Sequence, residues 1–137
     1  MRTFRPTGAR IVAYVVAVIM LVLTFVIAFA LPADISFTPP ETITLWIIIV
    51  AVLVLLHGVG RSRVVVGEEG VEVVNGYRRH DVSWHEIEGF AMNDGAPWPT
   101  MVTTDDERVM LFAIQGSDGS AYCREALAYL RSKVRPR

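Results

Sequence analysis

The sequence has a single cysteine, Cys123, and almost no net charge, the formal value being −1 at pH 7. One cysteine cannot form a disulfide within the chain, which suits a reducing compartment such as the cytoplasm. A near-neutral chain also lacks the clustered basic face that nucleic-acid binding requires, and no nucleic-acid-binding motif is present. These absences favour a cytoplasmic domain and argue against a nucleic-acid partner.

Charged side chains are missing from two further stretches. Residues 11–31 form a run of about 21 residues without Asp, Glu, Lys or Arg, which at about 1.5 Å per residue reaches across a bilayer core of about 30 Å. Residues 43–59 form a second run of about 17 residues, with only His57 near its end. The segment between the runs has three prolines that prevent one continuous helix: Pro32, Pro39 and Pro40. The sequence therefore predicts a transmembrane helical hairpin over residues 11–60.

The hairpin is expected to serve as an anchor in the cell membrane, with both termini in the cytoplasm. Its connecting loop carries Asp34 and Glu41, whereas basic residues flank its outer ends: Arg2, Arg5, Arg10, Arg61 and Arg63. Thr24 is the only polar residue inside the first run, so a transport pathway is not expected. An alternative is that the first run is a signal peptide cleaved near residues 28–30, although it is long for that purpose.

A different pattern follows, with residues 1–10 and 61–137 expected as the cytoplasmic parts. Short β-branched or alternating runs predict about six strands, at residues 64–66, 71–74, 77–82, 87–92, 100–104 and 108–114. The pair Asn75-Gly76 signals a tight hairpin, because both positions tolerate positive φ. Asp105, Asp106 and Glu107 would form the acidic tip of another hairpin.

The last element changes to helical spacing. Apolar residues recur at steps of three and four, at Cys123, Ala126, Leu127, Leu130 and Val134. Asp118 or Ser120 would cap the start of this helix. An antiparallel sheet followed by one amphipathic helix predicts an α+β fold, in which the helix closes the open side of a curled sheet.

The stretch from Arg78 to Phe90, RRHDVSWHEIEGF, concentrates polar groups. Ser83 and Glu86 have the spacing of a capping box, which predicts a short helical turn that points Trp84 and Ile87 into the interior. A small enzyme using the imidazole and carboxyl groups of this stretch would need them to converge: His80, Asp81, His85 and Glu86. The two histidines have no zinc-ligand spacing, and Ser83 lies in no nucleophile elbow. We therefore expect no catalytic, cofactor-binding or metal-binding residue, and no small-molecule substrate.

These residues resemble the small bacterial PH-domain membrane proteins of the low-molecular-weight protein antigen 6 type. The likeness covers about residues 10–130 and rests on the strand Gly70–Val73, the Asn75 turn, the pair Arg78-Arg79, and Val82-Ser83-Trp84 followed by Ile87. It implies a hairpin, a PH-like antiparallel β-barrel and a C-terminal helix, without enzymatic activity.

Two features depart from the family pattern. A PH barrel has a seventh strand, which we expect to be short or to lie within residues 93–99. The first hairpin loop, residues 67–70, holds Glu68 and Glu69 where phosphoinositide-binding PH domains usually carry basic residues. Two carboxylates would repel a phosphorylated headgroup, so phosphoinositide recognition is not carried over.

The function we expect is a non-enzymatic protein-interaction or self-association module at the cytoplasmic membrane face. Its partner would be a membrane protein or a second copy, and Trp98, in the segment Ala96–Pro99, would anchor the interface unless it covers an end of the barrel. The alternative is anionic-lipid binding through Arg61, Arg63, Arg78 and Arg79, assisted by the tail residues Arg131, Lys133, Arg135 and Arg137. The competing explanation for these arginines is ordinary topogenic and solubilising charge.

Overall fold

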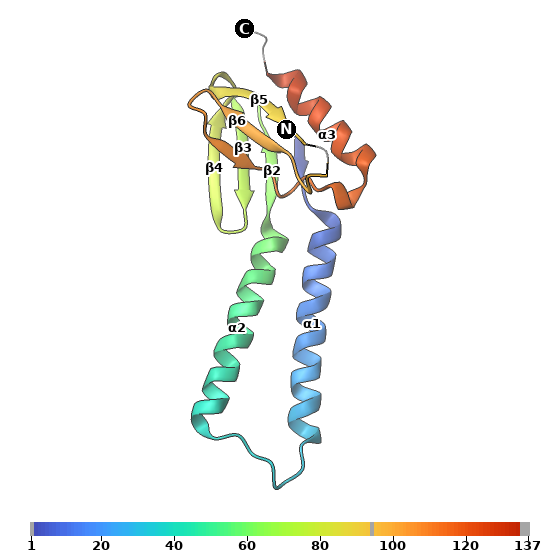
Figure 1. Cartoon of the computed structure of the whole chain (residues 1–137), viewed down its shortest axis with the longest axis vertical. Coiled ribbons are helices and arrows are strands. Elements are labelled where there is room, and N and C mark those ends of the chain that lie inside the picture. Colours follow the sequence, from blue (N-terminus) through green and yellow to red (C-terminus); the bar gives the residue numbers. More distant parts are fainter. Residues whose placement is uncertain (1, 94, 135–137) are drawn as a thin grey trace.

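The computed structural model describes residues 2–93 and 95–134. Two long helices form a hairpin that projects from one end of a β-rich domain (Figure 1). Helix α1 spans Thr7–Ala30 and α2 spans Pro39–Arg61. Each is long and apolar enough to cross a membrane.

Both helices begin about one turn before the charge-free runs predicted. Pro39 and Pro40 interrupt the chain but also start α2, since proline is tolerated in a first turn where the N–H groups lack helical partners. The N–H of Thr38 donates to the Glu41 carboxylate at 2.8 Å, in a capping box. The two predicted apolar helices are therefore present, with starts at Thr7 and Pro39 rather than at residues 11 and 43.

The β-rich domain contains two antiparallel sheets. The first has the order β1-β2-β3-β4, formed by Arg2–Phe4, Arg63–Val66, Gly70–Asn75 and Arg78–Ser83. The second has the order β5-β6-β7, formed by Ile87–Ala91, Thr100–Thr103 and Arg108–Met110. Among the described residues no strand pairing joins the two sheets, so the domain is a curled pair of sheets rather than a closed barrel. The predicted α+β architecture is confirmed.

The seventh strand is β1, at the N-terminus of the chain. Of the two alternatives, a short strand or one near residues 93–99, the first is correct, because β1 has only three residues and the described part of residues 93–99 forms turns and bends. Arg2 pairs with Val66 and Phe4 with Val64, so β1 runs antiparallel along β2. The hairpin is thus inserted between two neighbouring strands of one sheet. Because such strands lie about 4.8 Å apart, α1 and α2 leave the domain side by side.

The turn between β3 and β4 is shifted by one residue from the predicted Asn75-Gly76 pair. Asn75 pairs with Arg78, so the two turn residues are Gly76 and Tyr77. Gly76 has φ +64°, whereas Asp106 is the only non-glycine residue with positive φ in the described chain. A positive φ at the first turn position alone matches a type II′ turn. Asn75 stays in the strand, where its side-chain amide bonds the backbone of Met110 and Phe112.

The core lies between the two sheets and helix α3, Ser120–Lys133. The predicted helical face is confirmed, because Cys123, Ala126, Leu127 and Leu130 are all buried. Strand β7 ends at Met110, earlier than predicted, and the following residues turn through the core, with the Ile114 N–H bonded to the Leu111 carbonyl at 3.0 Å. Figure 1 shows α3 along one side of the sheets, next to the N-terminal strand.

Candidate functional site

The β3–β4 turn is attached to the end of α2 that meets the domain. Ser62 follows α2 and is 5% exposed; its hydroxyl accepts the Gly76 N–H at 2.9 Å and donates to the Gly58 carbonyl at 3.1 Å. The Tyr77 hydroxyl donates to the carbonyl of Val54, deeper in the helix. We call these contacts, together with the glycines described next, the hairpin–domain junction. They hold the turn against α2 at two levels.

Two glycines in α2 allow this close approach. A Cβ atom on Gly58 would lie 2.8 Å from Cε2 of Tyr77, and one on Gly60 would lie 2.6 Å from the hydroxyl oxygen of Tyr14 in α1. Tyr14 also reaches His57, with 3.2 Å between its hydroxyl and Nδ1. The sequence His57-Gly58-Val59-Gly60 therefore brings the turn, α2 and α1 together.

The start of α1 is bound by a residue from far along the chain. Asp118 ends the short 3-10 turn η2, Gly116–Asp118, and its Oδ1 accepts the Gly8 N–H at 2.8 Å. Pro6, the residue before α1, makes no side-chain cap of its own. A carboxylate at a helix N-terminus satisfies an unpaired N–H and complements the helix dipole. The prediction that Asp118 caps the last helix was wrong, because Gly119 holds the cap position of α3 and Asp118 serves α1.

The N-terminal strand is held against α3. The Arg2 guanidinium lies 2.8 Å from Glu125 and 4.8 Å from the ring centroids of both Phe4 and Tyr129. Phe4 itself is 2% exposed and meets the rings of Tyr122 and Tyr129 edge-on. The β-rich domain therefore contacts both α1 and α2, and its N-terminal strand β1 contacts its C-terminal helix α3.

The four arginines suggested as lipid contacts have different environments. Arg63 and Arg79 lie 2.9 and 3.0 Å from the two carboxylate oxygens of Glu72. Arg79 also lies 2.9 Å from Asp81, and this hydrogen bond, followed by the charges of Asp81 and Glu72, raises the pKa of Arg79. Both arginines are thus already paired on the outer face of the first sheet.

The other two arginines lie near the hairpin. The Arg61 guanidinium is 5.1 Å from the ring centroid of Tyr77. Arg78 is exposed and makes no ion pair within residues 2–93 and 95–134. Only Arg61 and Arg78 of the four keep a charge that no carboxylate of the described chain neutralises.

The segment that contains Trp98 is partly buried within the domain. Pro99 is fully buried and Trp98 is half-buried, with its ring edge-on to Phe112 at a centroid distance of 4.5 Å. Part of the Trp98 surface is therefore covered by a contact within the domain. Whether its remaining surface meets a partner stays a prediction.

The motif around Trp84 forms the predicted capped turn. The 3-10 turn η1 spans Trp84–Glu86, and the Ser83 N–H donates to the Glu86 carboxylate at 3.1 Å in a capping box. Ile87 is 2% exposed and enters the core as predicted. Trp84 also packs against the core but is only partly buried, and its Nε1 donates to the Gly67 carbonyl at 3.1 Å. Trp84 thus joins η1 to the β2–β3 loop.

The histidines and carboxylates of this stretch are divided between strand β4 and the turn η1. His80 and Asp81 are successive residues of β4 and so point to opposite faces of the sheet. Asp81 is bound to Arg79, while Glu86 accepts the Ser83 N–H and His85 is exposed on η1. Within the described residues no three His, Cys, Asp or Glu side chains are placed to share a metal ion.

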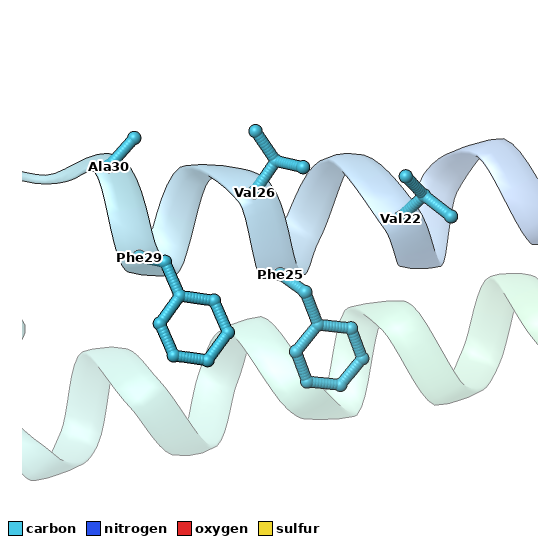
Figure 2. A pocket seen from close by; sticks show the side chains of 5 residues that line it. All are labelled: Val22, Phe25, Val26, Phe29 and Ala30. Atoms are coloured by element: carbon cyan, nitrogen blue, oxygen red, sulfur yellow. The ribbon is translucent and has the colours of Figure 1, made fainter.

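Two concave surfaces formed by described residues differ in the side chains that line them. One lies on α1 near the connecting loop, with a volume of about 520 Å³, and is lined by Val22, Phe25, Val26, Phe29 and Ala30. Figure 2 shows Phe25 and Phe29 pointing toward α2 while Val26 and Ala30 point away. A second, of about 340 Å³, lies on the β-rich domain and includes the carboxylates Glu69, Glu72 and Asp81. The first has only apolar side chains, and two carboxylates of the second already bind arginine.

The comparison with known families agrees with this architecture. The family model described as bacterial PH domain matches residues 61–132, from the end of α2 through nearly all of α3. No curated protein and no solved structure matches the chain. The matched segment holds six of the seven strands and the closing helix, and it covers more than half of the 137 residues. The chain therefore belongs to the bacterial PH domain family.

Proposed function

We propose that α1 and α2 cross the cell membrane and that both chain ends lie on its cytoplasmic side. The β1–β2 pairing supports this, because residues 2–4 and 63–66 must share one side of the membrane, as two spans allow. The basic residues at the outer ends of the hairpin favour the cytoplasm for that side. Cleavage near residues 28–30 is disfavoured, since it would remove Phe4 from the core and Gly8 from Asp118.

This orientation is tested by cysteine accessibility in cells. The background is Cys123→Ala, which removes the native thiol, a buried one, so that each variant carries a single cysteine. Ser36→Cys in the connecting loop is expected to react with a membrane-impermeant maleimide added outside. Asp105→Cys, in the β6–β7 turn, is expected to react only after the membrane is permeabilised. The opposite pattern would refute the orientation.

On the cytoplasmic side, the domain is proposed to bind a protein partner or a second copy, without catalysis. The observation that carries this proposal is the fixed orientation of the domain: the Gly76–Tyr77 turn is bound to α2, so the opposite ends of β3 and β4 lie about 17 Å farther from the hairpin. Exposed carboxylates gather at that far end, from Glu68, Glu69, Glu86, Asp105, Asp106 and Glu107. Backbone bonds of 3.1 Å from Trp84 to Glu69 and of 2.9 Å from Thr104 to Glu86 join the three loops that carry them. An acidic surface directed away from the bilayer suits a protein with basic residues better than a lipid.

The interaction is tested by photocrosslinking in native membranes. A photoreactive residue is placed at position 68 or 106 on the acidic end and, as a control, at position 47 on the hairpin. A discrete crosslinked band from the acidic end supports the proposal, and a band of twice the chain mass identifies self-association. A third variant carries the photoreactive residue at position 98. Absence of any discrete band from positions 68, 106 and 98 would refute the proposal.

Of the tail residues expected to assist the alternative, anionic-lipid binding, Arg131 donates to the Phe90 carbonyl at 3.2 Å and Lys133 lies 5.5 Å from the Tyr129 ring centroid. Arg135 and Arg137 lie outside the described residues. Because Arg63 and Arg79 are paired with carboxylates, the alternative otherwise rests on Arg61 and Arg78. Their position near the hairpin supports it. The test is the thermal stability of the full chain in nanodiscs of neutral and of anionic lipid. Equal stabilisation of the native chain and of Arg61→Gln/Arg78→Gln by anionic lipid would remove this alternative.

A further inference from the structure

We infer that the β3–β4 turn enters the interfacial layer of the bilayer, so that Tyr77 and Met110 contact phospholipid directly. This contact is distinct from the protein-interaction role proposed above, and it rests on the proposed crossing of the membrane by α2. The pair Tyr77 and Met110 is called the apolar tip below.

The apolar tip consists of large hydrophobic side chains that the described β-rich domain leaves exposed. Tyr77 is 53% exposed and Met110 is 46% exposed, and in residues 61–93 and 95–134 they are the large hydrophobic side chains that remain exposed. Isolated exposed hydrophobics are common on soluble domains. Both lie at the same end of the domain, because Asn75, two residues before Tyr77, donates its side-chain amide to the Met110 carbonyl.

The depth of the tip follows from its contact with α2. The Tyr77 hydroxyl bonds the Val54 carbonyl, and Val54 lies about two helical turns before Arg61, which corresponds to about 10 Å toward the middle of the helix. Arg61 is the charged residue that ends α2 and belongs with the headgroups. The Tyr77 hydroxyl therefore lies up to about 10 Å below Arg61. The ring of Tyr77, against which the Arg61 guanidinium lies, extends from there toward the headgroup level, where tyrosine is enriched in membrane proteins. Figure 1 shows the β3–β4 turn directed toward α2.

The neighbouring charges fit a lipid surface. The Arg61 guanidinium lies 5.1 Å from the Tyr77 ring centroid, in a cation–π contact that places its charge and the aromatic ring together at the end of α2. Arg78 follows Tyr77 and is exposed without an ion pair in the described chain. An aromatic ring flanked by two unneutralised arginines matches the boundary between acyl chains and phosphate groups. The ligand class is thus the phospholipid interface in general rather than one headgroup.

The experiment places an environment-sensitive fluorophore on single cysteines in a Cys123→Ala background, with the full chain reconstituted in phosphatidylcholine vesicles. The decisive variant is Met110→Cys, because only the backbone carbonyl of Met110 bonds the turn and Tyr77 stays intact. Tyr77→Cys is the second variant. Glu68→Cys, at the far end of the domain, is the aqueous control, and Val50→Cys, 54% exposed in α2, is the membrane control.

The label at position 110 is expected to lose emission to lipids that carry a quencher near the headgroup, more than to lipids quenched near the chain end. Position 77 is expected to behave likewise, and position 68 to respond only to aqueous iodide. Labels at 77 and 110 that match position 68 while position 50 is quenched by lipid would overturn the inference alone. Labels shielded from iodide but not quenched by lipid would also overturn it, since protein would then cover the tip. Loss of lipid quenching at position 50 would instead refute the membrane crossing.

Discussion

The carboxylate of Asp118 lies 2.8 Å from the backbone nitrogen of Gly8, although 110 residues separate the two positions in the sequence. Through this contact a residue of the PH-like domain caps the first apolar helix. Ser62 makes the corresponding link at the second helix, between Gly58 and Gly76. The domain is therefore built onto the hairpin rather than tethered to it by a linker.

Replacement of Asp118 should weaken this attachment. Asp118→Ala removes the acceptor for the Gly8 N–H, and loss of a helix cap costs about 0.5–2 kcal/mol of unfolding free energy. Denaturant unfolding of the detergent-solubilised chain measures the loss. Asp105→Ala, an exposed carboxylate in the β6–β7 turn, serves as the control and should change stability by less than about 0.5 kcal/mol. Equal losses in the two variants would contradict the capping role.

The N-terminal strand should be essential to the domain. Phe4→Ala empties a site that is 2% exposed among Tyr122, Tyr129 and the core, and such truncations cost about 3–5 kcal/mol. Limited proteolysis should then cut α3 sooner than in the native chain. Thr3→Ala, whose side chain is exposed in the same strand, should cost less than about 1 kcal/mol. A stable domain in the Phe4 variant would show that β1 is dispensable.

The glycine beside Tyr77 should not tolerate a side chain. A Cβ at position 58 would lie 2.8 Å from the Tyr77 ring, so Gly58→Ala forces the ring away and should cost about 1–3 kcal/mol despite the better helix propensity of alanine. In Gly58→Ala/Tyr77→Ala the clash disappears, so the two losses should not add. Gly89→Ala is the matched control, because its Cβ would meet no atom within 4 Å. Additive losses, measured by thermal unfolding, would argue against the contact.

The arginines paired with Glu72 should depend on its charge. Glu72→Gln weakens two ion pairs that are partly exposed, and it should lower the free energy of unfolding only slightly, because exposed ion pairs gain little Coulomb energy in water. The loss should shrink as salt rises, because mobile ions screen exposed charges. Urea unfolding at low and high ionic strength tests this, with Glu88→Gln, an exposed carboxylate on β5, as the control. A loss independent of salt would point to packing rather than charge.

Alkaline pH should destabilise the domain through one buried and one partly buried group. Burial raises the pKa of the Cys123 thiol from its usual 9.0, and burial followed by the Asp118 charge raises the pKa of Tyr122 from 10.0. The folded state then keeps protons that the unfolded chain releases, so the stabilisation contributed by these two groups is fully present below about pH 9 and is lost as pH rises above it. Cys123→Ala should flatten the first part of this fall, measured from about pH 8 to about pH 10.5, and Tyr122→Phe the later part. An unchanged profile in both variants would contradict the assignment.

Local patterns in the sequence were sufficient for most elements. The charge-free runs predicted both apolar helices, the β-branched runs predicted six strands, and the spacing of Cys123, Ala126, Leu127 and Leu130 predicted the buried face of α3. Ser83 and Glu86 likewise predicted their capped turn, because only three residues separate the partners. The strand at Arg2–Phe4 escaped prediction, since three residues carry too little alternation to reveal a strand.

The sequence by itself determined the two apolar helices, six of the seven described strands and the family, because these depend on periodicity and on residues close together in the chain. Only the tertiary structure decided that Glu72 neutralises Arg63 and Arg79, that Asp118 caps α1 rather than α3, and that Tyr77 reaches Val54. Each of these depends on which surfaces meet after folding, and the hydrophobic pattern of a strand or helix does not specify which charged or polar residue of a distant segment will lie opposite it.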